Sequence, residues 1–217
     1  MVPVISIVGL SGSGKTTLIE KLVCELTARG HRVGTVKHDA HAFEIDHEGK
    51  DSWRHKRAGA RTVVLASKEK LAVIRDTDSE WEPARLVASF LDHLDVVVAE
   101  GFKESGFPKI EVVRAERSVE PVCSDSPLLR AVATDVEGLS PGVPVYGIDD
   151  FKGIADLVEE EVMGRHRPSG LSVTVDGRVV ETDPFTEGMI REGVLGMLKT
   201  LKGCADASEV EIRIKRR

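Results

Sequence analysis

Hydrophobic and polar positions in the first part of the chain follow two periods, one typical of buried strands and one typical of helices. Val4 to Val8 is a short apolar run that predicts a strand, and a glycine-rich turn follows it. The next apolar positions recur at helical spacing, at Leu18, Ile19, Leu22, Val23 and Leu26. Gly30 predicts the end of that helix, and Val33 to Val36 predicts a second strand. Because β-α-β crossovers are right-handed, we expect both strands in one parallel sheet.

The same alternation of short apolar runs and helical stripes continues through the middle of the chain. Further strands are predicted at Thr62 to Leu65, Leu71 to Ile74, Val96 to Ala99, Ile110 to Val113, Leu129 to Ala133 and Val143 to Tyr146. Helices are predicted at Pro83 to His93 and at Phe151 to Met163. Strands that alternate with helices indicate an α/β fold with a doubly wound, mostly parallel sheet.

The pattern changes after a segment of linker composition, Gly164 to Gly170. We therefore expect one domain over residues 1–165 and a small C-terminal extension over residues 166–217. The extension is predicted to be a β-β-α-β unit. Its strands are Leu171 to Val175, Arg178 to Val180 and Val210 to Ile214, and its helix carries an apolar stripe from Phe185 to Leu201.

Composition limits the class of protein. The chain has 217 residues and a formal net charge of −6, so its overall field repels nucleic acid and anionic membranes. Its three cysteines are far apart and form no CxxC pair, which argues against a disulfide framework and favours a reducing cytoplasm. We find no basic leader and no run of about 18 apolar residues, so neither export nor a membrane span is expected.

The turn after the first strand has the spacing of a P-loop, Gly9-Leu-Ser-Gly-Ser-Gly-Lys-Thr16. Its glycines allow successive backbone N–H groups to turn inward around phosphate oxygens, next to the positive N-terminus of a helix. Lys15 is expected on the β and γ phosphates, and the Thr16 hydroxyl on Mg²⁺. The predicted phosphate site comprises Gly9, Ser11, Gly12, Ser13, Gly14, Lys15, Thr16 and Thr17.

A P-loop also needs an acidic group for the metal, normally at the end of a neighbouring buried strand. Glu100 falls at the tip of the apolar run that begins near Val96, where open α/β sheets bind their ligands. Gly101 would let the backbone pass close to the γ-phosphate. The alternative is that Glu100 is a solvated carboxylate at a strand end.

The segment from Lys37 to Arg57 is rich in charge and follows the second strand. One interpretation is a switch or second anion-binding segment that uses Lys37, His38, Lys50 and Arg57. A solvated charged loop and helix face is the other. A metal site on His38, His41 and His47 is the least favoured, because neither spacing nor cysteine partners support it.

Asp135 ends the strand segment Ala133-Thr134-Asp135 and is a candidate for reading the base. A carboxylate can accept from the N1–H and 2-amino groups of guanine, which adenine lacks. Such a residue can equally be a turn residue or a helix cap.

Taken together, these segments resemble the molybdopterin-guanine dinucleotide biosynthesis protein B (MobB) family, within the SIMIBI class of P-loop proteins. The resemblance rests on the P-loop with Thr17-Leu18, Val36-Lys37-His38, Gly49-Lys50-Asp51-Ser52, Ala58-Gly59-Ala60, Glu100-Gly101-Phe102-Lys103 and Pro108-Lys109-Ile110-Glu111-Val112. It covers about Val4 to Met163 and stops at the linker.

The resemblance implies a homodimeric GTP-binding accessory protein for the guanylyltransferase that joins GMP to molybdopterin, with at most weak GTPase activity. It also implies that Glu100 and Asp51 serve Mg²⁺, and that the Lys37 to Arg57 segment faces the nucleotide or molybdopterin. Two other functions stay open: an ATP-dependent kinase or ligase resembling dethiobiotin synthetase, and a GTP-dependent metallochaperone.

Overall fold

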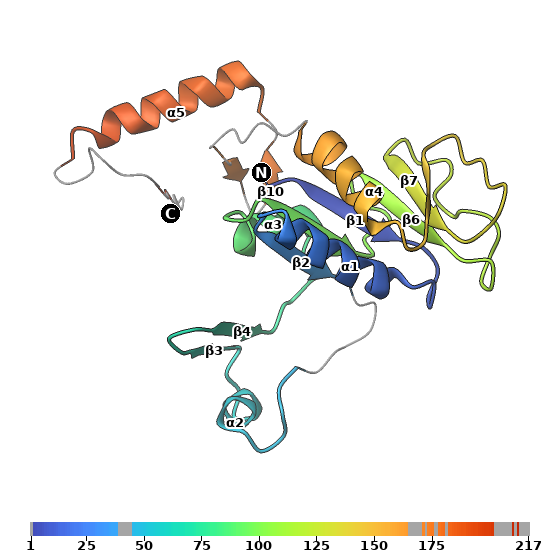
Figure 1. Cartoon of the computed structure of the whole chain (residues 1–217). Coiled ribbons are helices and arrows are strands. Elements are labelled where there is room, and N and C mark those ends of the chain that lie inside the picture. The colour runs from blue at the N-terminus through green and yellow to red at the C-terminus, as the bar shows by residue number, and fades with distance from the viewer. Residues whose placement is uncertain are drawn as a thin grey trace.

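A six-stranded sheet forms the centre of the computed structural model, which describes residues 2–38, 45–164, 171, 173–175, 178–180, 182–201, 210 and 212 (Figure 1). Its order is β2-β5-β1-β6-β7-β8, and all its pairings are parallel. The strands are β1 (Val4–Val8), β2 (Val33–Lys37), β5 (Val96–Glu100), β6 (Lys109–Val113), β7 (Leu129–Thr134) and β8 (Val145–Gly147). Parallel order places every C-terminal strand end at one edge, where the P-loop, Glu100 and Asp135 fall.

Helices cover both faces of this sheet, as the doubly wound fold requires. Helices α1 (Lys15–Ala28) and α4 (Phe151–Leu157), the latter continued by a π-helical segment η1 (Val158–Met163), lie on one face. On that face Leu22 and Ile154 pack in one cluster with Ile7 of the central strand. Helix α3 (Pro83–Phe90) covers the other face, where Val87 packs against Val4 and Val97. The predicted α/β fold is confirmed.

Two of the predicted strands form a separate unit. Strands β3 (Thr62–Ala66) and β4 (Leu71–Arg75) pair antiparallel with each other, outside the main sheet. Four residues separate them, which is too short for the crossover that parallel neighbours need but suits a hairpin. The short helix α2 (Asp51–Arg57) lies beside this hairpin, and the two project away from the sheet (Figure 1).

The C-terminal extension contains a two-stranded antiparallel sheet and a helix. They are β9 (Val173–Val175), β10 (Arg178–Val180) and α5 (Pro184–Leu198), which begins after the capping carboxylate of Asp183. The predicted linker after Gly164 and most of the predicted last strand lie outside the described residues. The described Val210 and Ile212 belong to no strand. In the described part of the chain, no helix has the length and apolarity to cross a membrane.

Candidate functional site

The turn between β1 and α1 has the backbone geometry of an anion cradle. Gly9, Gly12 and Gly14 have φ angles of 136°, 72° and 89°, a region that other residues rarely adopt. A Cβ on Gly9 would clash with the carbonyl oxygen of Val112 on β6. Helix α1 begins after Gly14, and its first turn has neither a side-chain cap nor an acidic residue. Its first N–H groups are therefore available to an anion.

Lys15 folds back across this turn. Its Nζ donates to the carbonyl oxygens of Gly9 at 3.1 Å and Leu10 at 2.8 Å. The contacts hold the ammonium over the mouth of the cradle, where an incoming phosphate oxygen could replace a carbonyl. Ser13 is buried, and its hydroxyl has no partner among the described residues. The other predicted members, Ser11, Thr16 and Thr17, are exposed.

Glu100 lies next to the cradle. The Thr16 hydroxyl donates to its Oε1 at 3.1 Å, and the Lys37 Nζ lies 3.8 Å from the same oxygen. The Glu100 side chain is only 17% exposed. The structure thus brings together a hydroxyl from the first turn of α1, a carboxylate from the end of β5 and an ammonium from the end of β2. Hard oxygen donors of this kind suit Mg²⁺, which also takes phosphate oxygens and water.

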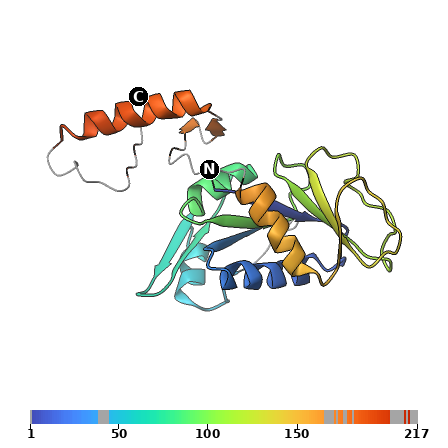
Figure 2. The same cartoon turned by 45° about the horizontal axis from the view of Figure 1, so that its top comes forward.

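The Lys37 to Arg57 segment divides into two parts. Lys37 and His38 are at the site: the His38 ring lies 5.2 Å from the Phe102 ring, and its Nε2 pairs with Glu80 at 2.7 Å. Lys50, Asp51 and Arg57, at α2, are not brought to the site, because α2 packs beside the hairpin instead of the sheet edge. Figures 1 and 2 both show α2 apart from the β1–α1 turn.

The predicted metal residues are only partly assembled. Asp51, the first residue of α2, is exposed and 3.9 Å from Arg54, so this structure leaves Thr16 and Glu100 without it. The predicted His41 lies outside the described residues. Among the residues that are described, no group of three or more His, Cys, Asp or Glu could hold a metal.

The Asp135 carboxylate already accepts hydrogen bonds from neighbouring residues. Its carboxylate accepts from the backbone N–H of Ala115 at 2.8 Å and from Nε of Arg114 at 2.8 Å, through different oxygens. These bonds hold the pKa of Asp135 below its ordinary value. A base that approached Asp135 would have to compete with both donors.

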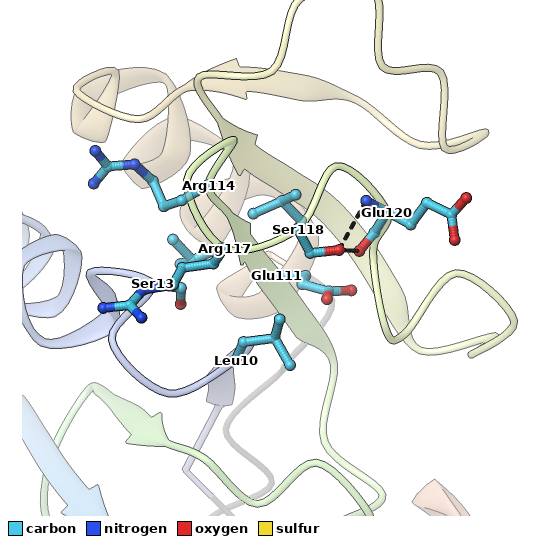
Figure 3. Close-up of a pocket in the computed structure, with 9 residues that line it drawn as sticks. Leu10, Ser13, Glu111, Arg114, Arg117, Ser118 and Glu120 are labelled. Atoms are coloured by element: carbon cyan, nitrogen blue, oxygen red, sulfur yellow. Dashed lines mark hydrogen bonds between the residues drawn. The ribbon is translucent and has the colours of Figure 1, made fainter.

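Sequence reasoning missed two arginines, Arg114 and Arg117, that follow β6 (Figure 3). A Cβ placed on Gly12 would lie 2.9 Å from Nη2 of Arg117, so this guanidinium lies directly over the cradle. A Cβ on Gly14 would lie 3.5 Å from Nη1 of Arg114. Both follow a predicted strand at the ligand edge, and that position was the available signal.

The loop that carries these arginines is fixed to the core by Glu111. This buried carboxylate accepts from the backbone N–H groups of Val122 at 2.6 Å and Cys123 at 2.8 Å. The small pocket between this loop and Leu10, drawn in Figure 3, has a volume of about 10 Å³. That volume admits about one water molecule and no larger ligand.

Comparisons with known proteins identify relatives of the chain. The family model described as "Molybdopterin guanine dinucleotide synthesis protein B" (MobB) matches residues 4–135. The molybdopterin-guanine dinucleotide biosynthesis adapter protein of Haemophilus influenzae is 41% identical over 159 residues, which are 73% of this chain and 88% of the relative. The Escherichia coli adapter protein is 38% identical, over 74% of this chain and 93% of the relative.

A solved structure agrees with these matches. A crystal structure titled as molybdopterin-guanine biosynthesis protein B shares 34% identity with this chain, with a TM-score of 0.56. The match covers 72% of this chain and 98% of that one. The matches to the Haemophilus influenzae relative and to this structure each leave out about a quarter of the chain.

Proposed function

Because the chain belongs to the MobB family, as its motifs predicted, we propose that it is a GTP-binding accessory protein in molybdenum cofactor biosynthesis. It would assist a guanylyltransferase that converts molybdopterin to molybdopterin-guanine dinucleotide. The relatives named as adapter proteins of this pathway support that role.

The observation that carries the proposal is the assembly of cradle, Lys15, Thr16 and Glu100 at one sheet edge. The phosphates would lie on Gly9 to Thr17, with the Lys15 ammonium on the β and γ phosphates. Arg117 adds a second cation, next to Gly12 of the cradle. Although the chain carries a net charge of −6, these side chains make the site locally cationic.

Mg²⁺ fits the two oxygen ligands that the structure places 3.1 Å apart, the Thr16 hydroxyl and the Glu100 carboxylate. When bound, the ion would be held by Thr16 and Glu100 and would neutralise negative charge on the phosphates. Glu100 would orient it from β5, and Lys37 would balance the carboxylate. We expect hydrolysis of GTP to be weak at most.

The exposed hairpin supports a homodimer. Strands β3 and β4 carry exposed apolar side chains, of which Val64, Leu71 and Val73 lie on one face of the hairpin and Leu65 lies on the other. An exposed apolar patch of this kind is typical of a protein contact. A second copy of the chain is the proposed occupant, and Leu71→Glu should then shift the protein toward monomer in sedimentation. We also propose a cytoplasmic location.

A reconstitution with purified components tests the function. The chain, a guanylyltransferase, molybdopterin, GTP and Mg²⁺ are combined, each is omitted in turn, and dinucleotide formation is followed over time. We expect no dinucleotide from this chain alone and a higher yield when it joins the transferase. Dinucleotide made by the chain alone would make it the enzyme, and an unchanged yield would remove the accessory role. Preference for ATP would instead favour a kinase or ligase.

A further inference from the structure

A cavity of about 160 Å³ lies beside the P-loop, between the start of α1 and the loops that follow β6 and β8. It is lined by Gly14, Thr17, Leu18, Lys21, Arg114, Ile148 and Asp149. Pockets for drug-sized ligands usually have volumes of about 300 to 1,000 Å³, so this cavity suits one part of a nucleotide. Gly14 and Thr17 belong both to the cavity wall and to the predicted phosphate site, so the two are continuous.

Asp149 supplies the cavity with a carboxylate. Nζ of Lys21 donates to its Oδ1 at 2.6 Å, while the side chain stays 80% exposed. The Lys21 hydrogen bond lowers the pKa of Asp149 below its ordinary value. At neutral pH the group is therefore an ionised carboxylate, which can only accept hydrogen bonds. Such a group favours a ring edge with two donors and repels an edge that offers an acceptor.

Arg114 supplies a planar cation to the same cavity. Its Nε is fixed by Asp135 at 2.8 Å, which orients the guanidinium and leaves its terminal nitrogens near Gly14. Guanidinium planes stack on aromatic rings. Ile148 adds an apolar side chain to the wall, and its backbone N–H donates to the Thr134 carbonyl oxygen at 3.1 Å, which ties this loop to β7.

We propose that this cavity receives the purine base of the nucleotide and that Asp149, instead of Asp135, selects guanine. The inference rests on the proposed function, since it takes the triphosphate to lie on the P-loop. Guanine offers N1–H and a 2-amino group, both of which can donate to the Asp149 carboxylate. Adenine presents its N1 lone pair at the same place and is repelled. Asp135 is then a positioning residue, which acts through Arg114.

The test compares the full chain with Asp149→Asn and with Asp135→Asn, a matched change at the other carboxylate. Each protein is titrated calorimetrically with GTP, ATP and xanthosine triphosphate in the presence of Mg²⁺. Xanthine has a carbonyl in place of the 2-amino group, so an asparagine amide can donate to it while its oxygen accepts from N1–H. Edge readout of this kind changes affinity by about 10- to 100-fold.

We expect the unchanged chain to prefer GTP, and Asp149→Asn to lose GTP affinity and gain affinity for xanthosine triphosphate. Asp135→Asn should lower the affinity for all three nucleotides by a similar factor. It loosens Arg114 but leaves Asp149, which would contact the edge of the base, unchanged. The inference is overturned, while GTP binding stands, if Asp149→Asn keeps the affinity ratios of the unchanged chain among the three nucleotides. It is also overturned if the change of preference from GTP to xanthosine triphosphate appears in Asp135→Asn. If the unchanged chain binds no triphosphate, the proposed function itself fails.

Discussion

The Thr16 hydroxyl donates to Glu100 across 3.1 Å, although 84 positions separate the two residues in the chain. The contact follows from the sheet order: β1 and β5 are parallel neighbours, with Ile7 paired to Glu100. The end of β5 is thereby placed beside the first turn of α1. The Thr16 hydroxyl and the Glu100 carboxylate, which would both bind Mg²⁺, therefore lie side by side at the ligand edge of the sheet.

Glu100→Gln should weaken Mg²⁺-dependent binding of GTP more than metal-free binding. The substitution keeps the size of the side chain but removes the charge that would face the metal. Calorimetric titration with GTP is run with Mg²⁺ and again with a chelator. Glu104→Gln, an exposed change in the loop that follows, is the matched control. Equal losses in the two conditions would exclude a role of Glu100 at the metal.

Lys15→Ala should abolish detectable GTP binding while the protein stays folded. The Lys15 ammonium contacts two loop carbonyls and no core side chain, so its loss should cost affinity and little stability. Loss of a charge-assisted contact to the phosphates is expected to cost about 2 to 5 kcal/mol. Thermal unfolding monitors the fold, and Lys68→Ala in the exposed hairpin turn is the control. Unchanged affinity would remove the phosphate site from the proposal.

Glu111→Ala should lower the free energy of unfolding by about 3 kcal/mol, since it leaves the partly buried N–H group of Val122 and the buried N–H group of Cys123 without an acceptor. Urea denaturation measures the loss, and Glu116→Ala, an exposed change in the same loop, serves for comparison. The loop with Arg114 and Arg117 should also loosen, so affinity for GTP should fall. An unchanged unfolding midpoint would show that water replaces the carboxylate.

The strands of the main sheet were predictable because most are buried on both faces. Val96, Val97 and Val98 are fully buried, and such runs of apolar residues are typical of parallel strands. The hairpin strands have the same kind of residues, yet Leu71 is 70% exposed. Period and composition identify a strand, but they do not identify its neighbour. The place of β3 and β4 outside the sheet therefore could not be predicted from pattern alone.

The positions of several polar side chains were harder to predict from the sequence. Lys109 is buried on a strand, and its ammonium donates to the carbonyl oxygens of Ser105 at 2.6 Å and Phe107 at 2.8 Å. A pattern of apolar positions does not predict that a lysine is buried in this way. Arg114 and Arg117 reach the P-loop only because β6 lies next to β1 in the sheet. The P-loop itself was predictable, because its glycine spacing encodes the backbone geometry locally.

The chain shortened to residues 1–165 should keep its fold and its affinity for GTP. Among the described residues, the three buried apolar clusters include none beyond Met163, so we expect the main core to form without the extension. In the extension, Phe185 and Met197 are 75% and 73% exposed, so α5 contributes little burial to the rest of the chain. The match to the Haemophilus influenzae relative extends over 159 residues, about the length of the shortened chain.

Strand β10 contacts α3, so removal of the extension should cost some stability. We expect a loss of about 1 kcal/mol or less, as for changes at a surface. Urea denaturation and GTP titration of the full and shortened chains measure both quantities. A shortened chain that unfolds without cooperativity would show that the extension completes the core across α3. A shortened chain that folds normally but binds GTP more weakly would assign the extension a part in the site.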